Sequence, residues 1–179
     1  MSGITPPTAP VFKARRKKYI YVSSALTGLA PEVRERTLSL LERIDAMCRR
    51  AFYIRLPCYL PHRYSDPVLN HAMTPREVYL LDELRVRQAR LMIVVSLQPS
   101  DGVGGEMVIA DVKKIPVILC IPPDRGTVSR FTLGNPALGP KGSERIIRYR
   151  DEKHLLDELK RMIMALLGRK NQRAPRKKR

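Results

Sequence analysis

The sequence has no tryptophan, only three cysteines and no long apolar run among its 179 residues. Cys48, Cys58 and Cys120 are scattered and form no C-x-x-C pair, which argues against a disulfide framework and a zinc site. We expect reduced, buried thiols, no bound metal and a cytoplasmic location. No apolar run approaches the ~20 residues of a membrane span, and no charged-then-apolar leader resembles a signal peptide. We therefore expect no membrane-embedded segment.

Acidic residues are missing from both ends of the chain. Residues 1–18 contain five Lys or Arg and residues 169–179 contain seven, without one Asp or Glu. These ends supply most of the net charge of +17 and leave about +5 for residues 19–168. We predict disordered basic segments on either side of one folded domain, since hydrophobic residues make up 44% of the chain. The ends either aid solubility or bind an anionic partner, which is nucleic acid without sequence preference or an anionic membrane surface.

Strand-like and helix-like patterns alternate through residues 19–168. Apolar and β-branched runs predict strands over residues 19–24, 52–57, 91–97, 116–121 and 145–150. Helical periodicity predicts helices over residues 31–50, 75–90, 103–114 and 152–167. This alternation predicts a single flavodoxin-like, Rossmann-like α/β domain, with about five mainly parallel strands and helices on both faces. The long Pro- and His-containing loop over residues 58–73 is typical of a functional or disordered segment.

The stretch "QPSDGVGGE" (residues 98–106) follows the most apolar of these strands. Gly102, Gly104 and Gly105 allow a ligand to approach the backbone, and the next helix N-terminus favours a phosphate. Ser100 adds a hydroxyl. The same composition also suits a plain strand-to-helix turn, so both interpretations remain open.

Two carboxylates need an explanation. Glu106 comes early in the expected helix, where an acid commonly caps the helix or pairs with its dipole. Asp82 shares one helical face with Val78, Val86 and Ala89, where an ionised carboxylate is costly without a partner or a function. Two carboxylates around one cleft suggest the cleavage of a glycosidic bond. For Asp82 the simpler explanation is a salt bridge to Arg85 or Arg76.

Several of these segments resemble the nucleoside 2-deoxyribosyltransferase superfamily. They are "YVSSALTG" in residues 21–28, Asp82, and "QPSDGVGGEMVIA" with the later "PVILCI". The closest likeness is to the branch of 2'-deoxynucleoside 5'-monophosphate N-glycosidases, whose third strand ends in Q-P-S-x-G-x-G-x-E. Residues 98–106 match each defined position of that pattern, and the resemblance spans roughly residues 19–167.

The resemblance implies roles for individual residues. Glu106 would meet the anomeric carbon as nucleophile or as stabiliser of the transition state, Asp82 would help to protonate the departing base, and Tyr21 matches the family's tyrosine. Ser100 with the backbone of Gly102 and Gly104 would hold the 5'-phosphate. Ala25 replaces the branch's phosphate-binding serine, and the nearby candidates for that part are Ser23, Ser24, Thr27 and Gly28. His62 either reads a base edge or is a surface or structural residue.

The segment over residues 128–136 resembles the one that the family presents to a neighbouring subunit. Ser129 would then complete the phosphate pocket across a homodimer interface, and Arg130 would assist. A loop of this kind can also fold back over its own sheet.

The resemblance implies an enzyme that needs no cofactor and takes a nucleotide substrate. It would hydrolyse the N-glycosidic bond of a (deoxy)nucleoside 5'-monophosphate, or transfer the deoxyribosyl group between bases. Two other hypotheses remain: a TIR-like NAD hydrolase, and a catalytically silent nucleotide sensor or nucleic-acid-associated module.

Overall fold

The computed structural model describes residues 19–51, 56–66 and 68–168. The basic ends, for which we predicted disorder, lie outside the described residues. So do residues 52–55, which make up most of the predicted second strand.

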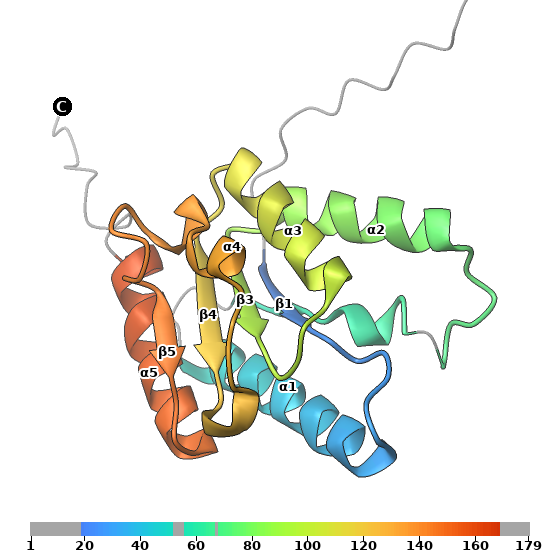
Figure 1. The fold of residues 1–179 in the computed structure, drawn as a ribbon, viewed down its shortest axis with the longest axis horizontal. Coiled ribbons are helices and arrows are strands. Elements are labelled where there is room, and N and C mark those ends of the chain that lie inside the picture. Colours follow the sequence, from blue (N-terminus) through green and yellow to red (C-terminus); the bar gives the residue numbers. More distant parts are fainter. Residues whose placement is uncertain (1–18, 52–55, 67, 169–179) are drawn as a thin grey trace, which may run out of the picture.

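A five-stranded sheet forms the centre of the domain (Figure 1). The strands are β1 (Ile20–Ser24), β2 (Cys58–Tyr59), β3 (Leu91–Val95), β4 (Val117–Ile121) and β5 (Ile146–Arg148). Their order is β2-β1-β3-β4-β5 and every pairing is parallel, which confirms the predicted architecture. Strand β2 lies at Cys58–Tyr59, in the segment expected to be a loop, and of residues 52–57 only Leu56 and Pro57 are described, neither of them in a strand.

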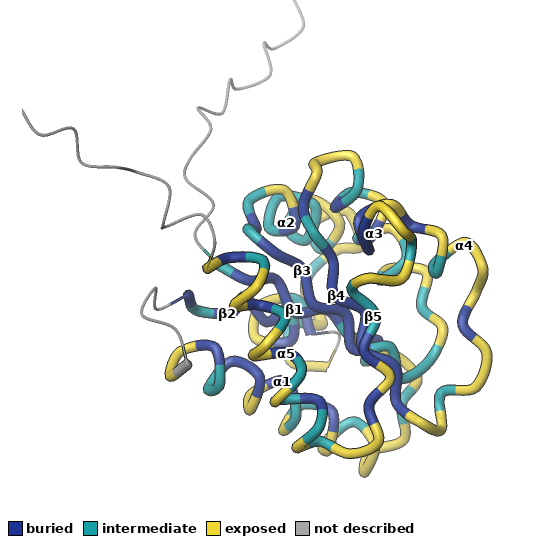
Figure 2. Tube along the Cα trace, turned by 90° about the vertical axis from the view of Figure 1, so that its left-hand side faces the viewer, coloured by how far each residue is buried: buried dark blue, intermediate teal, exposed yellow. Residues whose placement is uncertain are grey.

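Helices cover both faces of the sheet, as Figure 2 shows. Helices α1 (Pro31–Ala51) and α5 (Glu152–Leu167) pack on one face, and α2 (Pro75–Gln88) and α3 (Asp101–Val112) on the other. Successive strand residues point to opposite faces. Ile20 and Val22 therefore join the core beneath α1 and α5, whereas Tyr21 joins the core beneath α2 and α3.

Local sequence signals explain where these helices begin. Thr74 and Glu77 form a capping box at the start of α2, in which each side chain bonds to the other's backbone N–H. Ser100 caps α3, so that helix begins at Asp101, two residues before the predicted start. The glycines of the "DGVGG" stretch consequently lie within the first turns of α3, because the serine cap stabilises the helix from that point.

Some elements were not expected. Three short 3₁₀ turns (Pro61–Arg63, Pro123–Arg125 and Pro136–Leu138) and the short helix α4 (Arg130–Leu133) carry no sustained periodicity, and proline opens each of the three turns. Cys48, Cys58 and Cys120 are buried free thiols. Within the described residues, no helix combines the length and the apolar character that crossing a membrane requires.

The strand order fixes where a ligand would bind. β1 has β2 on one side and β3 on the other, so the direction of strand order reverses between β1 and β3. Ligands of open parallel sheets bind at such a reversal, beyond the carboxyl ends of the strands. The register pairs Ser24 of β1 with Val95 of β3, so both strands end side by side there.

Candidate active site

Glu106 is held by two hydroxyl groups from β1. Tyr21 Oη donates to Oε1 over 2.6 Å, and Ser23 Oγ donates to Oε2 over 2.5 Å. Tyr21 and Ser23 are two residues apart on one strand, so both point to the face that α3 covers. Glu106 lies in the second turn of α3, on the side of Met107 and Ala110 that faces the sheet. It therefore acts neither as a helix cap nor as a first-turn dipole partner.

The environment of Glu106 favours a proton near neutral pH. Burial raises the pKa of the Glu106 carboxyl to about 7, and the charge of Asp82 adds to this rise. The Ser23 and Tyr21 hydroxyls act in the opposite direction because they donate to the charged form. Burial also raises the pKa of the Tyr21 hydroxyl well above its usual value, so Tyr21 remains a donor.

Asp82 faces the same region from α2. Its carboxylate oxygens lie 3.3 and 3.5 Å from Ser65 Oγ, which is its hydrogen-bond donor. Burial raises the pKa of the Asp82 carboxyl to about 6, and the Ser65 and Tyr21 hydroxyls moderate the rise. Among the described residues Asp82 forms no ion pair with Arg76 or Arg85, so the salt bridge considered from the sequence is not formed.

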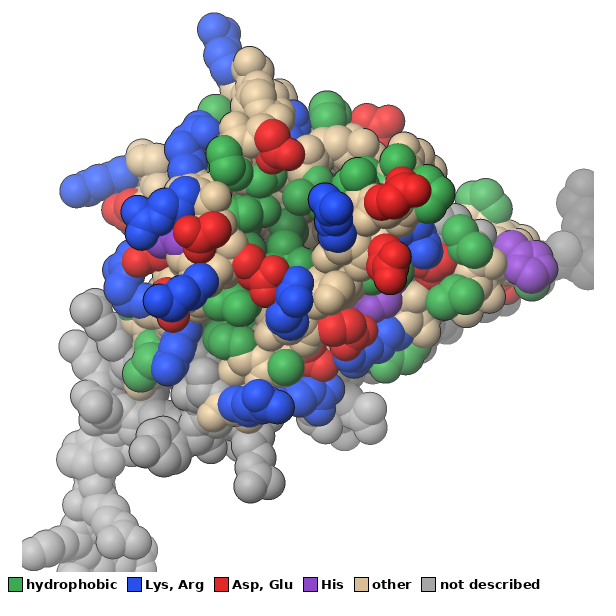
Figure 3. Space-filling model, turned by 90° about the horizontal axis from the view of Figure 1, so that it is seen from below, with side chains coloured by type: hydrophobic (Ala, Val, Ile, Leu, Met, Phe, Trp, Pro, Cys, Tyr) green, Lys and Arg blue, Asp and Glu red, His purple; other side chains and the backbone are tan. Residues whose placement is uncertain are grey.

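Both carboxylates open onto one cavity of about 180 Å³ at the β1/β3 reversal. Seen from the end at which the strands finish, the surface is hollowed over hydrophobic side chains and surrounded by charged ones (Figure 3). The cavity brings together most of the residues singled out in the sequence, namely Ser23, Ser24, Thr27, His62, Asp82, Ser100, Gly102 and Glu106.

The hydroxyl groups at this cavity differ in whether they already donate a hydrogen bond within the chain. Ser23 Oγ donates to Glu106, and Ser24 Oγ donates to the Val95 carbonyl over 3.0 Å. Thr27 is exposed in the loop after β1, where Gln98 Nε2 donates to its carbonyl over 2.9 Å. Gly28 follows with a φ of 75°, the left-handed conformation that favours glycine. Thr27 and Ser100 are thus the hydroxyls placed to bind an anion.

The start of α3 supplies backbone donors. The N–H groups in the first turn of a helix have no acceptor within it, and Gly102 lies in that turn. The Gly104 N–H is used within the chain, since it donates to the Ser100 carbonyl over 3.0 Å. Gly102 is therefore the glycine whose backbone is available to a ligand.

Ser129 and Arg130 are not brought to Glu106 within one chain. A second cavity of about 590 Å³ is lined by Gly104 and Ser129, and it shares Ser100 and Val103 with the first. Arg130 lines a separate shallow hollow near β5. Phe131, between these residues and the end of α4, is 76% exposed.

The loop after β2 contributes more than the sequence indicated. His62 is buried and its Nε2 lies 3.0 Å from Glu42 Oε1 on α1. Ser65 contacts Asp82, and the Tyr59 and Tyr64 rings stack with centroids 4.8 Å apart. The loop's length pointed to function, but no local pattern distinguished Ser65, because its partner lies on another element.

Comparisons with known proteins agree on the fold. No family model matches the sequence, and no curated protein matches it either. The CMP N-glycosidase BcmB of Clostridium botulinum superposes with a TM-score of 0.54 at 17% identity, over 81% of this chain and 99% of that one. The solution structure of BlsM superposes with a TM-score of 0.53 at 16% identity, over 93% of this chain and 100% of that one. A conserved protein of Enterococcus faecalis V583 superposes with a TM-score of 0.50 at 16% identity, over 86% of this chain and 98% of that one. At these identities the likeness establishes the fold, and it agrees with the architecture expected from the resemblance to the nucleoside 2-deoxyribosyltransferase superfamily.

Proposed function

We propose that the protein is a nucleotide N-glycosidase that cleaves the bond between base and sugar in a (deoxy)nucleoside 5'-monophosphate. The observation that carries the proposal is that Glu106 and Asp82 open onto one cavity, with Glu106 fixed by the Tyr21 and Ser23 hydroxyls. Buried carboxyl groups with raised pKa values are typical of sites that perform acid–base chemistry. The name of the structural neighbour BcmB, a CMP N-glycosidase, supports the same class of reaction.

The two carboxyl groups have different partners and therefore different roles. Glu106 accepts two short hydrogen bonds, which favour its ionised form, whereas Asp82 has a long contact with one hydroxyl. The pKa of Glu106 (about 7) is above that of Asp82 (about 6), so a single proton on the free pair lies mainly on Glu106; in this proposal the reactive arrangement has it on Asp82. Glu106 can then meet the anomeric carbon as a carboxylate, while Asp82 protonates the base.

The bond changes follow from these roles. Glu106 attacks C1' as the C1'–N bond breaks, the electron pair of that bond goes to the base, and Asp82 transfers its proton to the base nitrogen. Water then attacks C1', its proton goes to Asp82, and the bond to Glu106 breaks. The products are free base and sugar phosphate. Transfer follows if a second base takes the place of water.

The 5'-phosphate lies, in this proposal, against Thr27, Ser100 and the Gly102 N–H at the start of α3. These groups are on the cavity wall and retain the capacity to donate. We further propose that Ser129 of a second subunit completes this pocket with help from Arg130. Support for a homodimer comes from the position of both residues outside their own chain's Glu106 cavity, beside the exposed Phe131.

A substrate panel tests the activity. Wild-type protein is incubated with deoxynucleotides, ribonucleotides and NAD, and free base or nicotinamide is measured by chromatography. Glu106→Gln should lower turnover by about two orders of magnitude or more, since it removes the group that meets C1'. Glu83→Gln is the matched control, because Glu83 lies on α2 and pairs with Arg87 away from the cavity.

The panel also separates the other hypotheses. Release of nicotinamide alone would identify the TIR-like NAD hydrolase. Stabilisation by a nucleotide without any cleavage would identify a sensor. Undiminished turnover in Glu106→Gln would rule out the assignment of Glu106.

A further inference from the structure

His62 has a buried ring nitrogen that lacks a partner within residues 19–51, 56–66 and 68–168. Its side chain is 8% exposed and lines the cavity that contains both carboxylates. Nε2 contacts Glu42, but Nδ1 is buried and forms no hydrogen bond with any residue that the structure describes. An unpaired buried polar atom costs about 1–3 kcal/mol, and a ligand group in the cavity that His62 lines would supply Nδ1 with a partner.

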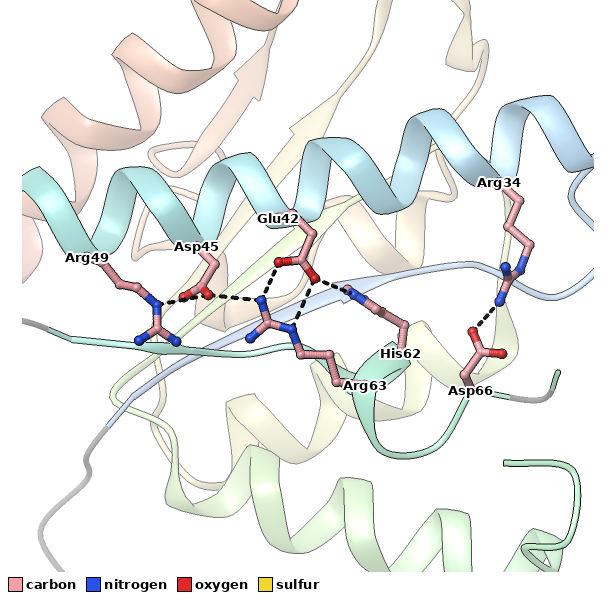
Figure 4. A network of polar contacts seen from close by, with 7 residues as sticks. All are labelled: Arg34, Glu42, Asp45, Arg49, His62, Arg63 and Asp66. Carbon is pink, nitrogen blue, oxygen red and sulfur yellow. Dashed lines mark hydrogen bonds and ion pairs between the residues drawn. The ribbon is translucent and has the colours of Figure 1, made fainter. Parts of the chain in front are cut away.

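Glu42 decides which ring nitrogen carries the proton. Arg63 holds Glu42 through hydrogen bonds to both carboxylate oxygens, one of them 3.0 Å long (Figure 4). The Arg63 guanidinium also lowers the pKa of the Glu42 carboxyl. An ionised carboxylate only accepts hydrogen bonds, so Nε2 must be the donor in the contact with Glu42. The proton of a neutral ring is therefore on Nε2.

Glu42 belongs to a network of carboxylates and arginines beside His62. Asp45 accepts from Arg49 over 3.0 Å and from Arg63 over 3.2 Å, in the same network as Glu42 (Figure 4). The two arginines thus balance the two carboxylates before His62 is counted. With Nε2 protonated and the ring neutral, Nδ1 presents a lone pair and can only accept.

We propose that His62 Nδ1 accepts a hydrogen bond from the amino group of the nucleobase, so that the cavity selects cytosine or adenine over uracil or hypoxanthine. A 4-oxo or 6-oxo base would place a carbonyl oxygen against the lone pair of Nδ1, which is repulsive. This inference rests on the proposed function, because it assumes that the base enters the cavity of Asp82 and Glu106. His62 acts here as a specificity-determining residue.

Two matched substrate pairs isolate the proposed contact. CMP has an amino group at position 4 of the base, where UMP has an oxo group and a proton on the neighbouring ring nitrogen. AMP and IMP differ in the same way at position 6. Ribose and deoxyribose forms are both assayed. We expect kcat/KM to favour the amino member of a cleaved pair by about tenfold or more. Equal cleavage of both members would overturn the inference and leave the proposed function standing.

Variants distinguish recognition from a structural role. His62→Ala should bring the amino-to-oxo ratio of kcat/KM close to one, whereas a merely structural loss would lower both members equally and would overturn the inference. Glu42→Gln provides a second variant that keeps the ring in place. Its amide can donate to Nε2 as well as accept, which frees Nδ1 to carry the proton, so the ratio should fall several-fold. Glu35→Gln, an exposed acid on the same helix, is the control and should keep the wild-type ratio.

Binding separates failure of the inference from failure of the function. Calorimetry with wild-type protein measures the dissociation constants of CMP, UMP, AMP and IMP. Tighter binding of CMP and AMP without cleavage would refute the proposed reaction and support the role of His62. Equal binding of the matched pairs, or binding of none, would refute that role.

Discussion

Tyr21 and Glu106 are 85 residues apart in sequence, yet the tyrosine hydroxyl donates a 2.6 Å hydrogen bond to the glutamate carboxylate. The contact joins the central strand β1 to helix α3 and fixes one oxygen of the carboxylate. Ser23 fixes the other oxygen from the same strand. Rigid placement of a charged group by short bonds from a sheet is what a preorganised catalytic carboxylate requires.

Removal of the tyrosine hydroxyl should impair this arrangement. Tyr21→Phe is expected to lower kcat/KM by about 10- to 100-fold, since the Glu106 carboxylate loses a donor to its charged form. The acidic limb of the pH–rate profile should also move to higher pH. Tyr19→Phe serves as the control, because the Tyr19 hydroxyl donates to the Arg85 carbonyl instead. Equal activity of both variants would contradict a role for the Tyr21 hydroxyl.

The carboxyl pair predicts a narrow bell-shaped pH–rate profile. The active state has one proton on the pair, which titrates near pH 6 and near pH 7, so kcat/KM should be highest between these values. Asp82→Asn should abolish the basic limb, whereas the acidic limb, on which Asp82 is already neutral, should remain. A profile of Asp82→Asn that still falls above pH 7 would show that another group is the acid.

Folding stability should respond to the same burial. The pKa of Glu106 is raised from 4.5 to about 7 in the folded protein, so the folded state binds the proton more tightly. Stability therefore falls as pH rises from about 4.5 to about 7. Glu106→Gln removes this loss. The free energy of unfolding of the variant minus that of the wild type should therefore be larger at pH 8 than at pH 5, by about 3 kcal/mol at most. Urea unfolding at both pH values measures the change, and a difference that is independent of pH would contradict the burial of an ionisable Glu106.

Mixing inactive variants tests the proposed dimer. Glu106→Gln is combined with Ser129→Ala/Arg130→Ala under conditions that exchange subunits. If each site borrows Ser129 and Arg130 from its partner, a heterodimer contains one site with neither lesion and regains part of the activity. A mixture of Glu106→Gln with Asp82→Asn is the control, since both residues belong to one chain's cavity and no intact site can form. Equal recovery in both mixtures, or none in either, would argue that Ser129 and Arg130 act within their own chain.

The sequence by itself determined the framework. Apolar runs and helical periodicity follow from the local geometry of the chain, and they located β1, β3, β4, α1, α2 and α5 to within a few residues. The capping box of α2 is likewise a local signal. The same reasoning missed β2 at Cys58–Tyr59 and placed the start of α3 two residues late. A strand of two residues carries almost no pattern, and the Ser100 cap prevails over the low helix propensity of the glycines that follow.

The tertiary structure decided how the candidate site is assembled. The sequence singled out Asp82, Glu106 and Tyr21, but Ser65, Glu42 and the partner of Ser23 become visible only when β1, α1, α2 and α3 are packed around the β1/β3 reversal. Hydrogen bonds between elements depend on positions fixed by packing over 17 to 85 residues of separation, and no local pattern records them. The pKa values also depend on the tertiary structure, because burial is a property of the folded chain. Burial raises the pKa of Glu106 to about 7, whereas a free glutamate in water is not buried.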